Sequence, residues 1–239
     1  MRSLVSVIVP VFDDAEALRR VLDAPNWAGA ELIVATAAGD ASVAPVRSRR
    51  PDVIWTESDR GRARQMNAGA AVAHGRWLLF LHADTRLPPD WPTAIDAAER
   101  DPRIAAGCFR FTLDSPSPAA RLIERGVRLR VDWLSLPYGD QALFVRSDIF
   151  RTIGGYAELP IMEDVDLVRR LRARGRLFRS PLPAMTSARR WERDGWLRRT
   201  ARHLALISLY FAGIPPDRLI WLDRARATHP GPPARRMYL

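Results

Sequence analysis

Acidic side chains stand directly after the apolar stretches of this sequence at three separate points. Asp13 and Asp14 follow the first apolar run, Asp84 follows a later one, and Glu163 with Asp164 opens an amphipathic segment. In a doubly wound sheet the ends of the first two runs lie on the same rim, so carboxylates far apart in the sequence converge on one ligand. The sequence therefore predicts a single binding site at this rim.

His82 and Asp84 are residue types that suit a divalent metal site. Side chains two apart at a strand end point to the same side, so Asp84 can bind the metal while His82 either joins it or faces phosphates. Mg²⁺ or Mn²⁺ on a nucleotide diphosphate takes only one or two protein carboxylates, because phosphate oxygens and waters complete its octahedron. Taken alone, however, an aspartate after a strand is more often a helix cap or a turn residue.

Strands and helices alternate through the first part of the chain, which has 239 residues in all. The predicted strands are Leu4–Val9, Glu31–Ala35, Asp52–Thr56 and Trp77–His82, and the predicted helices are Ala15–Leu22 and Arg62–Ala73. Leu4–Val9 is a continuous apolar, β-branched run, as in a strand buried on both faces. This order predicts an α/β fold with a Rossmann-like, mostly parallel sheet and helices on both faces.

The second half of the chain lacks this alternation, and we expect a mixed arrangement there. Helices are predicted at Thr93–Arg100, Arg121–Trp133, Glu163–Arg174 and Trp191–Phe211, and strands at Ala105–Leu113 and Gln141–Arg146. The length fits one domain over residues 1–226. The stretch 227–239, rich in proline and arginine, is predicted to be a flexible tail.

Several motifs, taken in order, resemble those of the family-two glycosyltransferases with the GT-A fold. They are Val7–Asp14 at the end of the first strand, Gly61–Gly69 in the nucleotide-sugar helix, Leu79–Asp84 at the metal and Met162–Asp164 at the catalytic Glu-Asp pair. A narrower resemblance, to a bacterial subgroup of small transferases described as associated with radical-SAM or selenodomain proteins, rests on His82–Thr85, Pro137–Gln141 and Glu163–Leu167. The resemblance covers the chain from Ser3 to about Arg224.

The resemblance implies a non-processive, hexosyltransferase-like enzyme (EC 2.4) that moves a sugar from a nucleotide-diphosphate donor, with UDP favoured, to an acceptor hydroxyl. It places the nucleotide-sugar half at about 1–88 and the acceptor half at about 89–226. A Mg²⁺ or Mn²⁺ ion held by Asp84, with His82, would neutralise the departing diphosphate. Asp164 would be the general base, so that the reaction inverts the anomeric configuration. Without the resemblance, Glu163 and Asp164 also fit simple helix N-terminal charge.

The resemblance also assigns the remaining site residues. Those expected at the donor are Pro10, Phe12, Asp13, Thr36, Arg64, Asn67 and Ala83. Phe12 would offer its ring to the base, and Arg64 would pair with a phosphate through its planar fork. Those expected on the acceptor side are Gly139, Asp140, Gln141 and Glu163, of which the first three fit a plain turn equally well. Arg190 and Trp191 would belong to a mobile lid over the diphosphate.

The second predicted strand departs from the family pattern. An aspartate that contacts the base or ribose usually ends this strand, and Thr36 stands in its place, while Asp40 is not assumed to replace it. A lost acceptor would leave a uracil imide hydrogen without its usual partner, so the base stays open although uridine is favoured. The departure also leaves open a catalytically degenerate nucleotide-binding module of the same fold. Retention of both Asp84 and Asp164 argues against that alternative.

The overall charge of +10 comes entirely from arginine, since the chain has no lysine. The arginines are scattered rather than gathered in one stripe with interleaved aromatic residues, so we expect no nucleic-acid partner. Cys108 is the only cysteine, which excludes an internal disulfide and is compatible with a reducing compartment. The start of the chain does not read as a signal peptide, so a cytoplasmic location is expected.

The segment Leu204–Tyr210, with Phe211 and arginine-rich flanks, has two interpretations. It packs in the core, or it rests on the inner membrane face and presents a lipid-linked acceptor. The longest apolar run, Leu204–Ile214, is shorter than the roughly 20 residues that cross a bilayer. The sugar, the acceptor, the metal preference and the oligomeric state stay open.

Overall fold

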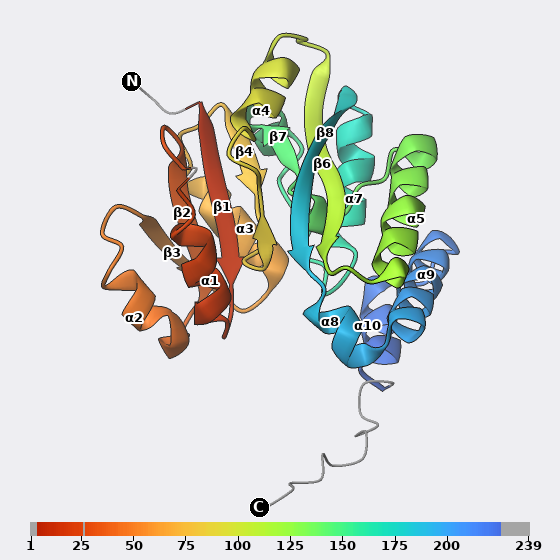
Figure 1. The fold of residues 1–239 in the computed structure, drawn as a ribbon. Helices are drawn as coiled ribbons and strands as arrows, with labels where there is room; N and C mark the ends of the chain where they lie inside the picture. The colour runs from red at the N-terminus through yellow and green to blue at the C-terminus, as the bar shows by residue number, and fades with distance from the viewer. Residues whose placement is uncertain (1–3, 26, 226–239) are drawn as a thin grey trace, which may run out of the picture.

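The computed structural model describes residues 4–25 and 27–225, and side chains as far as residue 220. One mixed sheet of eight strands runs through this part of the chain, with helices on both of its faces (Figure 1). The strands are β1 (Val5–Val11), β2 (Glu31–Ala37), β3 (Ile54–Ser58), β4 (Trp77–Phe80), β5 (Thr85–Arg86), β6 (Ile104–Asp114), β7 (Phe144–Arg146) and β8 (Arg176–Ser187). The α/β prediction is confirmed. The predicted tail at 227–239 lies outside the described residues.

Ten α-helices are described within these residues, together with two 3₁₀ turns, Ala41–Val43 and Gly139–Gln141. The helices are α1 (Ala15–Leu22), α2 (Ala44–Arg47), α3 (Arg62–Ala71), α4 (Pro92–Glu99), α5 (Pro118–Leu134), α6 (Ser147–Thr152), α7 (Glu163–Arg172), α8 (Arg189–Asp194), α9 (Trp196–Phe211) and α10 (Pro216–Ala225). None of the described helices is long and apolar enough to span a bilayer.

The strand order is β3-β2-β1-β4-β7-β6-β8-β5. β1 to β4 run parallel, as the alternating first half predicts, whereas β7 is antiparallel to both β4 and β6. β6 and β8 are again parallel, and the short β5 is antiparallel to β8 at the edge. The carboxyl ends of β1, β4, β6 and β8 therefore meet at one rim, where α8 also lies (Figure 1).

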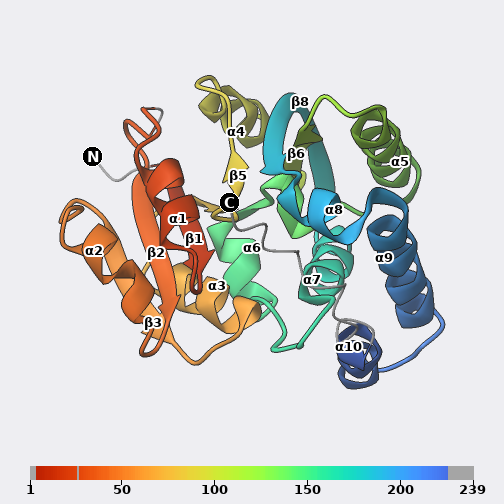
Figure 2. The ribbon, with the colours of Figure 1, turned by 60° about the horizontal axis from the view of Figure 1, so that its bottom comes forward.

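Alternation along β1 divides the core into two layers. Val7 and Val9 face the layer that packs against α1 and α4, whereas Ile8 faces the layer that packs against α3 and α7. Since successive side chains of a strand point to opposite faces, an unbroken apolar strand buries both. A third, smaller cluster joins the end of β6 to α5 and α8 through Phe111, Trp191 and their neighbours. Through Trp191 and Trp196 it connects α8 and the start of α9 to this end of the sheet. Figure 2 shows the positions of these helices from below.

Two predicted elements of the second half differ from the structure, and the long strand β8 was not predicted. The predicted strand Gln141–Arg146 is a 3₁₀ turn followed by the short β7, because Ala142 has a left-handed backbone with φ 48°. The predicted helix Trp191–Phe211 is split into α8 and α9 at Gly195, whose φ of 85° does not continue a helix. β8 was not predicted at all, because Pro181 and Pro183 argue against a strand, yet it pairs along β6 around a register shift.

We expect Gly69→Ala to destabilise the protein, because α3 crosses β1 closely at this point. A Cβ at position 69 would come within 2.4 Å of Ile8 Cγ2, and Ile8 is fully buried. Overpacking of this kind costs roughly 1–3 kcal/mol, which lowers the melting temperature by about 2–4 °C per kcal/mol at this chain length. The control is Gly126→Ala in α5, where an added Cβ meets nothing within 4 Å. Equal melting shifts for the two variants would contradict this account of the α3 crossing.

Candidate active site

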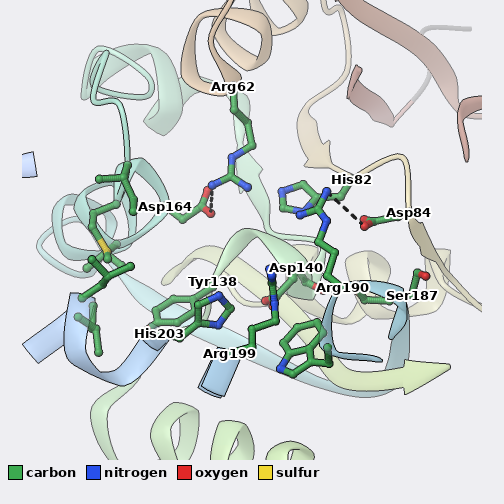
Figure 3. Close-up of a pocket in the computed structure, with 17 residues that line it drawn as sticks. Arg62, His82, Asp84, Tyr138, Asp140, Asp164, Ser187, Arg190, Arg199 and His203 are labelled. Carbon is green, nitrogen blue, oxygen red and sulfur yellow. Dashed lines mark hydrogen bonds and ion pairs between the residues drawn. The ribbon is translucent and has the colours of Figure 1, made fainter. Parts of the chain in front are cut away.

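Two adjoining cavities lie at the rim where the parallel strands end. The first, of about 270 Å³, reaches from Asp84 to Asp164 and on to the side of α9 (Figure 3). The second, of about 180 Å³, extends toward the end of β1. Both cavities are lined by Arg62, His82, Asp84 and Arg190. The predicted convergence of distant carboxylates on one rim is thus present in the structure.

Arg62 at the start of α3 holds the two carboxylates at the start of α7. Its Nε donates to Glu163 Oε1. Its Nη2 lies 3.6 Å from Asp164 Oδ2 (Figure 3). Glu163 and Asp164 are buried, with 2% and 7% of their surfaces exposed. Because Arg62 reaches both, it compensates the burial of two like charges side by side.

The surroundings of Asp164 favour its protonated form. Burial, and after it the neighbouring Glu163 charge, raise the pKa of this carboxyl to about 7 against the opposing effect of Arg62. Asp164 Oδ2 accepts a hydrogen bond of 3.1 Å from the Gly139 backbone N–H, whereas Oδ1 has no hydrogen-bond partner within the described chain. One oxygen is therefore held in place, and the other is available to exchange a proton.

Local backbone geometry sets the position of Asp164. Met162, which precedes α7, has a left-handed φ of 68° that a residue with a Cβ rarely adopts, and this turn directs Glu163 and Asp164 toward Arg62. Gly139 lies so close that a Cβ there would be 2.6 Å from Asp164 Oδ2. The glycine therefore permits the hydrogen bond that fixes the carboxylate.

His82 and Asp84 lie at the end of β4, with the Arg190 side chain next to them. Asp84 Oδ2 is 3.7 Å from Arg190 Nη2, and only 9% of the Asp84 side chain is exposed. Burial lowers the pKa of His82 well below its usual value, so the imidazole is neutral, and its buried Nε2 has no partner within the described residues. A neutral imidazole nitrogen is a possible metal ligand, since only the unprotonated form binds.

No group of three or more potential metal-ligating side chains occurs within the described chain. The residues present still fit Mg²⁺ or Mn²⁺, provided that a diphosphate and waters supply the other ligands, because such ions need only one or two protein carboxylates. Asp84 would be that carboxylate and His82 Nε2 the second ligand. Arg190 would have to release Asp84 when the ion binds.

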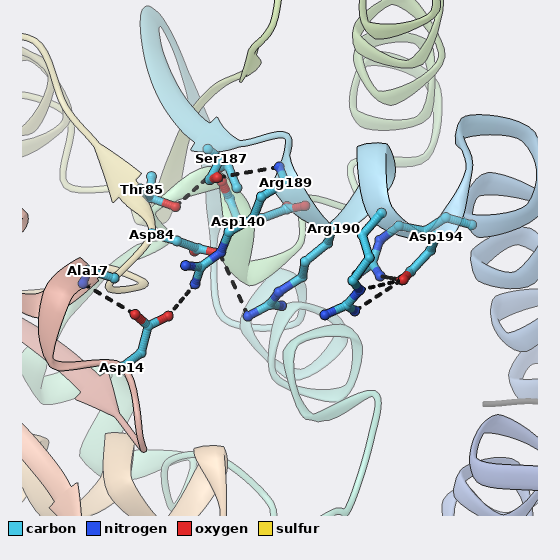
Figure 4. A network of polar contacts seen from close by, with 12 residues as sticks. Asp14, Ala17, Asp84, Thr85, Asp140, Ser187, Arg189, Arg190 and Asp194 are labelled. Carbon is cyan, nitrogen blue, oxygen red and sulfur yellow. Dashed lines mark hydrogen bonds and ion pairs between the residues drawn. The ribbon is translucent and has the colours of Figure 1, made fainter. Parts of the chain in front are cut away.

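Two successive arginines of α8 bridge the cavities from the second half of the chain. Arg189 donates to Asp14 Oδ2 after β1, and Arg190 pairs with Asp84 after β4 (Figure 4). Trp191 is buried, with the Arg199 guanidinium 4.9 Å from the centre of its ring, and it lines only the first cavity. α8 is thus connected to Asp14 and Asp84 by two ion pairs and to the core by one large side chain.

Three of the residues expected at the donor line the second cavity, namely Pro10, Phe12 and Ala83. Phe12 is 42% exposed, and the Arg60 guanidinium lies 4.2 Å from the centre of its ring. Asp13 has a left-handed φ of 51°, and its backbone N–H donates to Asp40 Oδ2 over 3.0 Å. Asp40 is therefore placed against the loop that follows β1.

The other expected donor residues line neither cavity. Thr36 is 3% exposed and pairs with Val11 in the sheet. Arg64 forms ion pairs with Asp59 and Glu158 across 3.1 and 2.9 Å, instead of facing the cavities. The amide of Asn67 both donates to and accepts from the Tyr156 backbone, so it connects α3 to the loop after α6.

Arg62 and Gln65 lie on a different face of α3 from Arg64 and Asn67. Both line the second cavity, and neither was predicted as a site residue. Gln65 is buried and donates to the backbone oxygens of Val11 and Ala35, which fixes the ends of β1 and β2 to α3. Positions 62, 65 and 69 share the helix face that packs on Ile8, whereas 64 and 67 share another. The apolar Met66 and the small Gly69 were the signals in the sequence that identify the inward face.

The expected acceptor residues divide in a similar way. Asp140 lines the first cavity, burial raises its pKa, and its Oδ1 has no partner within the described residues. Gly139 acts through its N–H to Asp164. Gln141 lines neither cavity, because its amide donates to Phe109 O over 3.1 Å and accepts from Tyr138 N over 3.3 Å. The far wall of the first cavity is formed by Tyr138, Ile161, Met162, Arg199, His203, Leu206 and Ile207.

The model of the family described as "Glycosyl transferase family 2" matches residues 6–157. This is more than half of the chain, so the protein belongs to glycosyl transferase family 2. The match includes His82 and Asp84 and ends before Glu163 and Asp164. No curated protein matches the sequence.

Solved structures of S. aureus TarS share the fold. The TarS 1–349 complex with UDP-GlcNAc has a TM-score of 0.55 and 15% identity, covering 78% of this chain and 59% of that one. The UDP complex gives a TM-score of 0.56 and 15% identity, with 79% and 61% covered. TarS 1–349 alone gives 0.55 and 15%, with 92% and 68% covered. The present chain therefore has the GT-A fold and spans about 59% of the TarS chain in the UDP-GlcNAc complex.

Proposed function

We propose that this protein transfers a hexosyl group from a UDP-sugar to an acceptor hydroxyl, one sugar at a time and with inversion of the anomeric configuration. The proposal rests on one observation above all. The first cavity has the Asp164 carboxylate, with a pKa raised to about 7, on one side and the carboxylate of Asp84 on another, with Arg62 and Arg190 between them. This combines a base with several positive charges for a departing diphosphate.

The donor would occupy the second cavity and the part it shares with the first. The exposed ring of Phe12 suits stacking on a nucleobase, and Arg62 and Arg190 suit phosphate oxygens. Uridine is favoured because TarS, which has the same fold, was solved with UDP and with UDP-GlcNAc. Thr36 is buried in the sheet, so the base would find its polar partners elsewhere. We propose Asp40, which accepts from the Asp13 N–H in the loop after β1, as one of these partners.

Asp164 would take the proton of the acceptor hydroxyl as the oxygen attacks the anomeric carbon. The new glycosidic bond forms while the bond to the diphosphate breaks, and its electron pair goes to the phosphate oxygen. Attack from the face opposite the diphosphate gives inversion. A divalent ion held by Asp84 and His82 would supply positive charge to the leaving diphosphate.

The test is a thermal melt of the protein with nucleoside diphosphates and UDP-sugars, each with MnCl₂, MgCl₂ or EDTA. We expect UDP with metal to raise the melting temperature by several degrees, since ligand at 100 times its Kd stabilises by about 2.7 kcal/mol. UMP, which lacks the second phosphate, is the matched control and should give a much smaller shift. If no nucleotide shifts the melt with either metal, the proposed donor site is wrong, whereas a UDP shift without any sugar transfer favours the degenerate nucleotide-binding module.

A further inference from the structure

Helix α9 carries a row of large apolar side chains on its solvent face. Leu197, Leu204 and Phe211 are spaced seven residues apart and are 85%, 60% and 54% exposed. Ala201 and Ser208 lie between them and are exposed as well. The sequence left open whether this helix packs in the core. In the structure only the face opposite the exposed row does so. That face buries Leu206 and contributes Ile207 to the wall of the first cavity.

Helix α5 has a second row of the same kind. Leu122, Leu129 and Trp133 fall on one side of the helix and are 66%, 59% and 83% exposed. The opposite side packs against β6 and buries Ala120 and Val131. Large apolar side chains that share one exposed helix face are unusual in a monomeric protein, because their apolar surface stays in contact with water instead of being buried.

The two rows lie on neighbouring helices. α5 and α9 lie next to each other in both ribbon views (Figures 1 and 2). Val127 of α5 packs in the same apolar clusters as Trp196 and Ile207 of α9, so the faces that join the helices are distinct from the exposed rows. We call Leu122, Leu129, Trp133, Leu197, Leu204 and Phe211 together the α5/α9 surface.

The charges beside these rows are mostly positive. α9 contains Arg198 and Arg202 but no acidic residue from its first to its last position. On α5, Arg125 and Arg128 are exposed next to the apolar row, whereas the acidic residues are paired, Glu124 with Arg121 over 2.6 Å and Asp132 with Arg179 over 3.6 Å. The Arg169 guanidinium lies 5.9 Å from the centre of the Phe211 ring. Cationic residues therefore flank the apolar row on both helices.

We propose that the α5/α9 surface docks on a bilayer that contains anionic lipids. Leucine, phenylalanine and tryptophan side chains would enter the boundary between headgroups and acyl chains, and the arginines would lie at the phosphates. Trp133, the most exposed tryptophan among the described side chains, suits this boundary because its ring is apolar and its N–H is polar. A second copy of the chain fits less well, since joining two such surfaces would bring their arginines together.

Docking in this way has a consequence for the proposed transfer, and this step rests on the proposed function. α9 carries surface residues on one side and His203, Leu206 and Ile207 of the first cavity on the other. The bilayer would therefore lie one helix diameter from the cavity that contains Asp164. We therefore propose that the acceptor is a lipid-linked molecule whose hydroxyl reaches the cavity from the bilayer.

The test is co-sedimentation of the full chain with vesicles of phosphatidylcholine alone or mixed with phosphatidylglycerol. We expect binding to the mixed vesicles that weakens with added NaCl, and a blue shift of tryptophan emission. Trp133→Glu combined with Leu204→Glu should reduce vesicle binding at least tenfold. The matched control is Val72→Glu at the end of α3, where an apolar residue of 37% exposure lies outside this surface.

Arg125→Gln combined with Arg198→Gln should lower binding to anionic vesicles and reduce its salt dependence, whereas Arg19→Gln on the exposed side of α1 should not. Melting shifts with UDP must stay unchanged in every variant, which separates membrane docking from the donor site. Absence of binding to both vesicle types would overturn the proposal. So would equal binding by the Trp133/Leu204 variant, or a wild-type dimer that this variant converts to a monomer.

Discussion

Asp164→Asn is expected to reduce the turnover rate of sugar transfer about 10²–10⁴-fold, the usual contribution of a general base. Asparagine keeps the shape of the side chain and can still accept from the Gly139 N–H, so the donor site stays intact. Binding of UDP, measured by the melting shift, should therefore change little. Steady-state kinetics of UDP release with and without acceptor gives the measurement.

The same substitution is expected to raise the melting temperature at pH 8. Burial raises the pKa of Asp164 from 3.8 to about 7, so the folded protein holds this proton more tightly than the unfolded chain. Ionisation thus costs folding free energy, and this cost accumulates as the pH rises from the unfolded to the folded pKa and stays constant above it. At about 1.4 kcal/mol per pKa unit it is at most on the order of 4 kcal/mol.

The gain in melting temperature should accordingly be several degrees at pH 8 and much smaller at pH 4.5. Asp166→Asn is the matched control, because Asp166 lies on the same helix and pairs with Arg170 in a partly exposed ion pair of 2.7 Å. It should leave transfer intact and not stabilise the fold. A wild-type turnover rate that does not fall as the pH drops below about 7 would contradict the role of Asp164 as the base.

The parts of the fold that were predicted from the sequence are those in which local pattern and tertiary environment agree. β1 and β4 are continuous apolar runs buried on both faces. α1 was predicted with its observed limits from the helical spacing of its apolar residues, and in the structure Asp14 caps it. β8 was missed because its prolines disfavour a strand locally. Only its long pairing with β6, across a large sequence separation, makes it one.

The candidate site shows the same division between local and long-range information. The carboxylates of the candidate site were predicted because they stand directly at the ends of predicted strands or at the start of a predicted helix. Arg64 was assigned to the donor from the family resemblance, but in the structure Arg62, on another face of α3, lines both cavities. The packing of α3 on the sheet decides which face turns toward the site, and Gly69 against Ile8 is part of that contact. The pairing of Arg189 with Asp14 joins residues 175 positions apart, and no periodicity in the sequence specifies it.

Asp84→Asn is expected to abolish the metal-dependent part of the UDP melting shift and to lower the turnover rate by at least about 10²-fold. The physical reason is that few side chains at the end of β4 can bind a metal ion. Asp84 is the only carboxylate among the residues that both cavities share, and the neutral His82 cannot compensate for its charge. Melts with UDP in MnCl₂ and in EDTA should therefore coincide for this variant.

Arg190→Gln is the matched variant, because it removes the cation 3.7 Å from Asp84 and keeps the carboxylate. A guanidinium and a divalent ion compete for the same oxygens, so removal of Arg190 should strengthen the binding of Mn²⁺ in the absence of nucleotide. The same variant should bind UDP more weakly, since a phosphate partner is lost. Opposite signs for metal alone and for UDP would indicate that Arg190 moves from Asp84 to the diphosphate as the donor site fills. If Asp84→Asn retains the full metal-dependent shift, the ion is held elsewhere and the assignment of Asp84 is wrong.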